Sequence, residues 1–202
     1  MKIAFITGAM RVDSQSGRVS LALQKRLQAL LPDAGIYALD LGRHPLPLWD
    51  EGVWKGDERW KQAWGPVREQ LQGCDGLVVV SPEYHGMVPA ALKNFLMLAA
   101  DHSVAFKPGL IVGVSASRNG AYPVAELRMT GGKNTHIDWI PEHLIVRDVA
   151  KMFIGDEPAD EADAYIRTRA DYALKLLIEY AKALKQVRDS GVIDLKAYGS
   201  GM

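Results

Sequence analysis

The chain has 202 residues, of which 48% are hydrophobic and 24% charged, and its 24 basic residues balance its 24 acidic residues. This length and composition predict one folded domain and exclude a disordered chain, while the zero net charge removes the usual electrostatic reason to expect a nucleic-acid or membrane-surface partner. The single cysteine, Cys74, excludes an intramolecular disulfide, a Cys-x-x-Cys redox pair and a cysteine-rich zinc site.

The first part of the chain predicts a strand, a helix and a second strand. Residues Lys2–Thr7 are a short apolar run, and apolar positions then recur at helical spacing over 19–31. Residues 35–41 form another short apolar run. Residues 42–56, which are rich in proline and tryptophan, predict an irregular loop.

The middle of the chain carries the clearest strand pattern. A helix is predicted over 60–71, although Gly65-Pro66 can kink or restart it. The continuous apolar run over 76–81 is typical of a strand that is covered on both faces. The helix predicted over 88–100 is apolar nearly all round, so we expect it either to be deeply buried in the monomer or to pair with another subunit.

The last part of the chain repeats the alternation of strand and helix. We predict a strand over 110–115, a helix over 123–129, a strand over 143–147 and a long helix over 166–184. A glycine-rich tail, expected to be mobile, begins at Gly191.

Alternating strands and helices predict a parallel sheet with helices on both faces. In such sheets, ligands bind outside the carboxyl ends of the strands, where the connections diverge. The loops that begin at Gly8, Ser81 and Ser115 are therefore the candidate site.

The first loop, residues 8–18, has the composition of an anion site. It lies between a strand and a helix N-terminus, where unpaired N–H groups favour an anion. Arg11 and Arg18 can add charge-assisted hydrogen bonds, and Ser14 and Ser16 can donate hydroxyls. The loop lacks dinucleotide and P-loop glycine patterns, which favours a monophosphate. The alternative is that a serine only caps the helix and that the arginines are solvated.

The second loop, residues 81–94, reads Ser-Pro-Glu-Tyr-His-Gly-Met-Val-Pro-Ala-Ala-Leu-Lys-Asn. Its prolines and glycine predict a rigid turn whose backbone amides can bind a planar polar ligand. Tyr84 can form a wall of that site or be an ordinary loop aromatic. His85, taken alone, is more typical of a hydrogen-bonded surface histidine than of a catalytic base.

This second loop closely resembles the signature of the NADPH-dependent FMN reductase family, which is flavodoxin-like and includes quinone, azo-dye and chromate reductases. The first loop is similar to the family's Gly-Ser-x-Arg-x-x-Ser, and Leu-Pro-Leu-Trp-Asp-Glu at 46–51 resembles the segment after its second strand. The resemblance spans roughly residues 1–150. It implies a doubly wound, three-layer sandwich with a five-stranded parallel sheet.

The resemblance also implies which residues approach FMN. Three residues of the first loop would hold the phosphate, five of the second would border the ribityl chain and the ring, and three of the third would approach the far edge of the ring: Arg11, Ser14, Ser16; Pro82, Glu83, Tyr84, His85, Gly86; Ser115, Ser117, Gly120. Two residues depart from the family pattern. Ala9 replaces a serine that would donate to the phosphate, and His85 replaces an asparagine. Residues 117–120 also lack the paired glycines often found there, and Arg128 is similar to a family arginine that can contact flavin, a neighbouring subunit or a surface acid.

The implied function is an FMN-dependent oxidoreductase that passes hydride from NADPH or NADH through FMN to a quinone, a flavin, an azo compound or a metal oxyanion. The chemistry belongs to the cofactor, so we expect no catalytic acid or base and no metal. The alternatives are a flavodoxin-type electron carrier or flavin-binding module without nicotinamide turnover, and a relative that has lost FMN and binds another phosphorylated ligand.

The sequence further predicts how the protein is organised. We expect one flavodoxin-like domain over residues 1–190 and a tail over 191–202. The family pattern implies a homodimer or homotetramer, and it favours the pairing of the helix over 88–100 with another subunit. The N-terminal apolar run is too short for a signal peptide, and no run of about 20 apolar residues occurs, so we expect a cytoplasmic protein.

Overall fold

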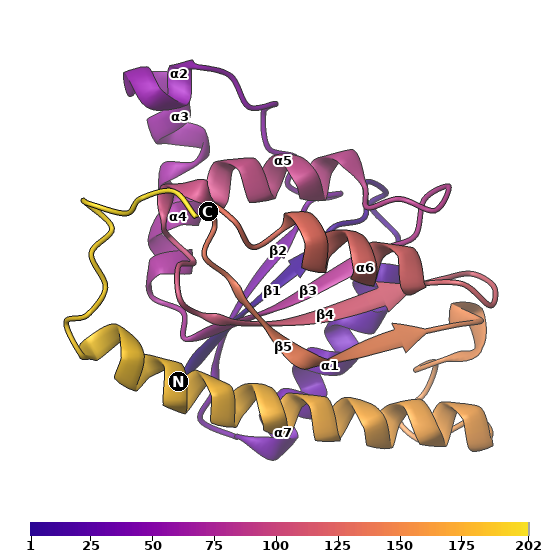
Figure 1. The fold of residues 1–202 in the computed structure, drawn as a ribbon. Helices are drawn as coiled ribbons and strands as arrows, with labels where there is room; N and C mark the ends of the chain where they lie inside the picture. The colour runs from indigo at the N-terminus through magenta and orange to yellow at the C-terminus, as the bar shows by residue number, and fades with distance from the viewer. Residues whose placement is uncertain (202) are drawn as a thin grey trace.

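The computed structural model describes residues 1–201, which form one five-stranded sheet (Figure 1). The strands are β1 (Lys2–Thr7), β2 (Gly35–Asp40), β3 (Gly76–Pro82), β4 (Pro108–Val114) and β5 (Asp138–Val146). Their order is β2-β1-β3-β4-β5, and every neighbouring pair is parallel. The predicted five-stranded parallel sheet is confirmed.

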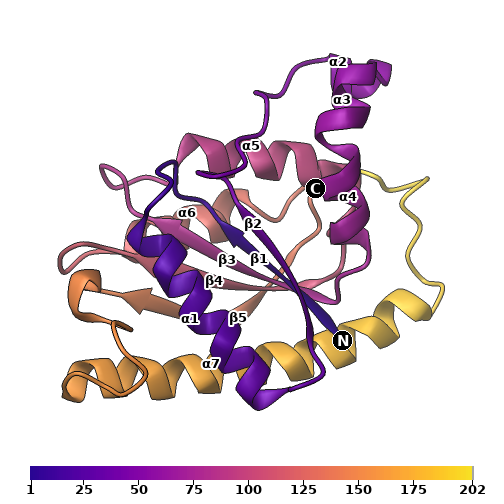
Figure 2. The same ribbon diagram turned by 180° about the vertical axis from the view of Figure 1, so that it is seen from behind.

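Helices cover both faces of this sheet (Figures 1 and 2). The first, α1 (Gln15–Leu30), lies with α7 (Glu161–Asp189) on one face, and α5 (Ala90–Leu98) lies with α6 (Ala121–Thr130) on the other. The apolar core is accordingly divided into two clusters, one under each helical layer. Within residues 1–201, no helix combines the length and the apolar character needed to cross a membrane.

The central strands are buried along their whole length, which explains their continuous apolar sequences. Every residue of β3 and β4 is buried. Val78 and Val80 belong to the core cluster beneath α1 and α7, whereas Leu77 and Val79 belong to the cluster beneath α5 and α6. Both side-chain directions of β3 therefore require apolar residues.

The region between β2 and β3 contains more helix than the sequence predicts. The expected loop over 42–56 includes a short helix, α2 (Gly52–Lys55), and the expected helix over 60–71 is two helices, α3 (Glu58–Ala63) and α4 (Gly65–Gln72). The restart at Gly65-Pro66 is confirmed. Pro66 suits the first turn of α4, where a missing N–H group breaks no helical hydrogen bond.

The last strand and the last helix are longer than expected. Strand β5 begins at Asp138, not at residue 143. The sequence pattern missed its first residues because they do not alternate between apolar and polar. The pairing with β4 shifts register between Gly109 and Ile111, and Pro141 lies in the shifted stretch. Two 3-10 turns, η1 (Ala99–Asp101) and η2 (Val149–Lys151), follow α5 and β5, and α7 begins at Glu161 after an Asp160 cap.

The apolar character of α5 is explained within the monomer. Leu92, Phe95, Leu96 and Leu98 are all 9% exposed or less, while Met97 is exposed. Of the two interpretations offered by the sequence, deep burial in the monomer therefore accounts for this helix. Its composition no longer argues for a second subunit.

The C-terminal tail returns to the body of the domain instead of extending away from it. The carbonyl oxygen of Gly199 lies 2.8 Å from His102 Nε2 and 3.3 Å from His136 Nε2. The chain at Gly201 passes close to the backbone carbonyl of Lys133. These contacts place residues 199 and 201 against the domain. Met202, the last residue of the predicted tail, lies outside the described residues.

Cys74 is a packed core residue, as its position before β3 predicts. Its side chain is almost fully buried, and its Sγ–H donates to the carbonyl of Gln70 at 3.2 Å. Burial raises the pKa of this thiol above its ordinary value. A reactive thiolate is therefore disfavoured at this position.

Candidate functional site

The loops that follow β1, β3 and β4 lie together at the carboxyl edge of the sheet. These strands are adjacent and parallel, so residues 8–14, 83–89 and 115–120 leave the sheet at the same edge. From β1 the chain continues to the outer strand β2, whereas from β3 it continues toward β4 and β5. The connections diverge between β1 and β3, which is where open parallel sheets bind ligands.

The first loop ends at Ser14, which caps helix α1. Its Oγ accepts a hydrogen bond from Gly17 N at 3.0 Å, and its backbone is extended, with φ −92° and ψ 149°. Ser14 and Ser16 are both buried at the start of this 16-residue helix. Ser14 therefore caps the helix, but a hydroxyl that accepts one bond keeps a proton to donate. The helix N-terminus remains suited to an anion.

The two arginines of the first loop have different environments. Arg18 donates to the carbonyls of Val149, at 2.5 Å, and Met152, so its guanidinium is bound to the segment after β5. Burial lowers the pKa of Arg18, although Asp163 opposes that shift. Arg11 is exposed. The sequence predicted that both arginines could bind an anion. In the structure Arg18 instead bonds the segment after β5, and Arg11 is the one that stays exposed in the first loop.

The first loop rests directly on the chain that follows β2. A β-carbon on Gly42 would lie 2.6 Å from the carbonyl oxygen of Arg11 and 3.1 Å from that of Ala9. Leu41 N donates to Thr7 O at 3.0 Å, which continues the pairing of β1 with β2 beyond the strands. The backbone of residues 9–11 can take this course because residue 42 has no side chain.

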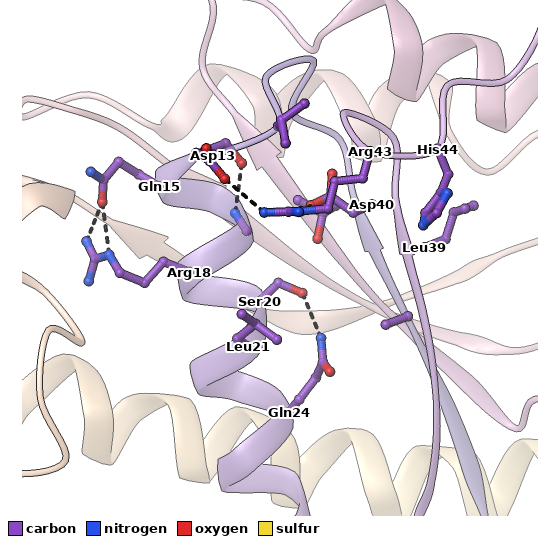
Figure 3. Close-up of a pocket in the computed structure, with 15 residues that line it drawn as sticks. Asp13, Gln15, Arg18, Ser20, Leu21, Gln24, Leu39, Asp40, Arg43 and His44 are labelled. Atoms are coloured by element: carbon purple, nitrogen blue, oxygen red, sulfur yellow. Dashed lines mark hydrogen bonds and ion pairs between the residues drawn. The ribbon is translucent and has the colours of Figure 1, made fainter.

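A hollow of about 520 Å³ lies between α1 and β2, beside the first loop (Figure 3). Arg43 pairs with Asp13 at 2.9 Å across its edge, and Arg18 turns away toward Gln15. The hollow includes Ser14 but no residue of the second or third loop. It therefore borders the predicted cofactor site and does not contain it.

The second loop is a tight turn between Tyr84 and Met87. Their backbones exchange two hydrogen bonds, of 3.1 and 3.0 Å, and the two residues between them are left-handed, with φ 53° at His85 and 76° at Gly86. Positive φ at both central positions requires residues that tolerate this conformation, and asparagine and histidine both do. The backbone thus explains why histidine can replace the family asparagine here.

Tyr84 has a buried hydroxyl without a partner. Among residues 1–201, no group lies within hydrogen-bonding distance of its Oη. A buried polar atom without a partner is rare and costs free energy. A ligand with a polar group that reaches this atom would supply the missing partner.

The third loop is tied to the second through Glu83. Gly120 N donates to Glu83 Oε2 at 2.7 Å. Within the loop, Ser117 N donates to Ser115 Oγ at 3.2 Å. A β-carbon on Gly113, in β4, would lie 2.3 Å from Gly120 O, so Gly113 and Gly120 make the close contact that the loop sequence alone does not reveal.

Two residues at the end of the second-loop signature fasten neighbouring segments. Lys93 pairs with Glu126 of α6, and Glu126 also accepts from Val88 N at 2.8 Å. Burial raises the pKa of Glu126, but the hydrogen bonds from Lys93 and Val88 outweigh it and hold this pKa below its ordinary value. The result links α5, α6 and the end of the loop.

Asn94 connects α5 to the segment after β2. Its Oδ1 accepts from Trp49 N and its Nδ2 donates to Pro47 O, both at 2.8 Å. Asn94 and the Leu-Pro-Leu-Trp segment both belong to motifs quoted from the sequence, but Asn94 and Trp49 lie 45 residues apart along the chain. Only the fold reveals that one motif holds the other.

Arg128 does not reach the three loops. Its guanidinium donates to the carbonyls of Ile140, at 2.8 Å, and Pro141, at 2.9 Å. Of the roles considered for it, the ion pair with a surface acid is not observed among residues 1–201. In the part of the chain that the structure describes, no three metal-ligating side chains gather into a metal site.

Sequence comparisons agree with this geometry. The sequence profile described as NADPH-dependent FMN reductase matches residues 1–149. The 2-hydroxy-1,4-benzoquinone reductase of a Burkholderia species is 30% identical over 182 residues, which are 85% of this chain and 93% of the relative. The NAD(P)H-dependent FMN reductase of Pseudomonas aeruginosa is also 30% identical, over 92% of this chain and 94% of the relative.

A comparison with solved structures supports the fold. A flavoenzyme NAD(P)H:(acceptor) oxidoreductase from Paracoccus denitrificans superposes with a TM-score of 0.69 at 18% identity, over 92% of this chain and 97% of that one. At this identity the likeness concerns the arrangement of the strands and helices alone.

Proposed function

Because the chain belongs to the NADPH-dependent FMN reductase family, we propose that it transfers hydride from NAD(P)H through bound FMN to a quinone-type acceptor. It is an oxidoreductase, and its cofactors are FMN and NAD(P)H. One observation carries the proposal. The first, second and third loops converge where the strand connections diverge, and the second has the turn that its signature predicts.

The residues at the site fit FMN. The phosphate would lie at the N-terminus of α1, where Ser14 and Ser16 carry hydroxyls and Arg11 supplies a positive charge. Ala9 offers no hydroxyl, so backbone N–H groups would take a larger share of the phosphate contacts. The unpartnered Tyr84 hydroxyl supports a polar ligand at the second loop.

The remaining predicted residues would form the border of the ring. Pro82, Glu83, His85 and Gly86 would act largely through their backbone, because the Glu83 carboxylate is already bonded to Gly120. Ser115, Ser117 and Gly120 would approach the far edge from the third loop. This assignment follows the family resemblance and the placement of the loops.

The cofactor, when bound, accepts two electrons as hydride from the nicotinamide and passes them to the acceptor. The chain would bind the phosphate at the first loop, hold the ring beside the second loop and exclude water. It needs no acid or base of its own. Exposed apolar residues of the second and first loops, Met87 and Met10, would offer contact surface to a flat, apolar acceptor.

We propose one domain over residues 1–190 with a tail over 191–202, a cytoplasmic location, and a homodimer or homotetramer.

The test is anaerobic reduction of the FMN-loaded protein by NADPH and by NADH, followed at the flavin absorbance band. We expect the purified protein to be yellow, to be bleached by a reduced nicotinamide and to be reoxidised by a benzoquinone. Steady-state NADPH oxidation with quinone, azo-dye and chromate acceptors then ranks the acceptors. A colourless protein that does not bind added FMN would refute the proposal.

A further inference from the structure

We propose that Glu83 is a positioning residue whose carboxylate holds the third loop against the second, so that both present one preformed surface to FMN. The inference rests on the proposed function, because the surface matters only if FMN binds there. The Glu83 side chain would then act on the cofactor through Gly120 and not by touching it.

Glu83 extends the contact between β3 and β4 beyond the sheet. Its backbone N–H donates to Val114 O at 2.9 Å, which continues the strand pairing by one residue. Its side chain then accepts from Gly120 N at 2.7 Å. The same residue therefore contacts both the start and the end of the 115–120 loop.

Gly120 is closely packed against β4 and β5. Its φ is 103°, and a β-carbon there would lie 2.7 Å from the side chain of Ile145. Its carbonyl oxygen occupies the space left by the missing side chain of Gly113. Such a backbone is favourable only for glycine. The Glu83 carboxylate accepts a hydrogen bond from the N–H group of this same glycine.

Gly120 is also the N-cap of α6, and no side chain of α6 caps that end. A carboxylate at a helix N-terminus is stabilised by unpaired N–H groups and by the helix dipole. Glu83 thus supplies the missing anion from another loop. The negative charge already at α6 leaves the N-terminus of α1 as the place for the cofactor phosphate.

The opposite side of the third loop is held by the chain after β5. Arg147 Nε donates to Arg118 O at 2.6 Å and to Asn119 O at 3.1 Å. Asp148 N donates to Ser117 O at 2.9 Å. The loop is therefore fixed by a cationic side chain on one side and an anionic one on the other, and removing Glu83 would free the end that adjoins the second loop.

Two variants and two controls test this role. Glu83→Ala removes the acceptor, whereas Glu83→Gln keeps a side-chain oxygen that can accept from Gly120 N. Gly113→Ala disturbs the same loop from β4 without altering Glu83. Glu157→Ala removes an exposed carboxylate that makes no side-chain bond in the described chain.

The readouts are hydrogen exchange of the Gly120 amide in the protein freed of FMN, and the FMN Kd from fluorescence quenching. We expect Glu83→Ala to speed the exchange about tenfold or more and to raise Kd about tenfold, the effect of losing one charge-assisted hydrogen bond. Gly113→Ala should also raise Kd. Glu83→Gln should remain within about threefold of the parent protein in both readouts, and Glu157→Ala should match the parent.

Unchanged Gly120 exchange in Glu83→Ala would overturn the proposal. A higher Kd without faster exchange would also overturn it, because the Glu83 side chain would then contact the ligand directly. Faster exchange with an unchanged Kd would overturn it as well. Failure of the parent protein to bind FMN would refute the proposed function, and with it any effect of Glu83 on FMN. The exchange measurement would still report separately whether Glu83 holds the loop.

Discussion

Gly42 faces the backbone of Arg11 so closely that a β-carbon at residue 42 would stand 2.6 Å from the Arg11 carbonyl oxygen. The obstacle is main chain, which cannot move aside as the end of a flexible side chain can. We expect Gly42→Ala to displace residues 9–11, to raise the FMN Kd about tenfold and to lower the free energy of unfolding by about 1–3 kcal/mol. Fluorescence titration and urea unfolding measure the two effects.

The matched control for this variant is Gly65→Ala. Gly65 is the first residue of α4, and a β-carbon there meets nothing within 4 Å. We expect its FMN affinity to match that of the parent protein. Equal affinity for Gly42→Ala and Gly65→Ala would show that the first loop does not depend on residue 42.

His85 provides a test of the left-handed turn. With φ at 53°, the position tolerates asparagine but not a β-branched residue. We expect His85→Asn to keep the free energy of unfolding within about 0.5 kcal/mol, and His85→Val to lower it by about 1–2 kcal/mol. His44→Val, at an exposed residue outside the left-handed region, is the control for the loss of imidazole. Equal stability of the two valine variants would contradict the argument.

Asn94 is expected to stabilise the segment after β2 through its two backbone hydrogen bonds. Asn94→Ala leaves the Trp49 N–H and the Pro47 carbonyl without their partner, which should lower the free energy of unfolding by about 1–3 kcal/mol. Asn94→Asp should be no better, because a carboxylate cannot donate to the Pro47 carbonyl. Urea unfolding measures both, with exposed Asn134→Ala as the control. Parent-like stability in Asn94→Ala would refute this role.

Lys107 makes stability depend on pH. Its side chain is buried, and Nζ donates to the carbonyls of Leu71, Gln72 and Ser103 at 2.7–3.0 Å. Burial lowers the pKa of Lys107 to about 8, against about 10.4 for an unfolded lysine. Between these values the unfolded chain binds more protons, so the free energy of unfolding rises with pH.

Below about pH 8 the charged, buried Lys107 lowers the free energy of unfolding by about 3 kcal/mol relative to the neutral amine. Above about pH 10.4 the lysine is neutral in both states, and this loss of stability is absent. We expect the parent protein to gain stability relative to Lys107→Met between pH 8 and pH 10, measured by urea unfolding. A constant difference between the two proteins over that range would show that the lysine titrates alike in both states.

The sheet could be predicted from the sequence because its central strands are buried on both faces. β1 matches its predicted bounds, and β3 and β4 differ from theirs by at most two residues. β5 could not be bounded in this way, because it is an edge strand with a register shift and an internal proline, and its exposed residues break the apolar run.

The candidate site could be predicted to the level of its loops but not of its contacts. Loop positions follow from strand ends, which are local features of the sequence. Arg18 binds carbonyls more than 130 residues away, and Glu83 binds an amide 37 residues away. Charge and hydrogen-bonding capacity show that such residues need partners, but only the packing of the layers decides which partners they meet.

Arg128 has a consequence for the behaviour of the protein in solution. An open edge strand is a template on which another chain can add a strand, and this is a common start of aggregation. On β5, the carbonyls of Ile140 and Pro141 already accept from Arg128, and proline has no N–H to offer. A strand that approached this stretch of β5 would find these hydrogen-bonding groups already bonded or missing. Arg128 therefore disfavours the addition of a further strand from another chain at this edge.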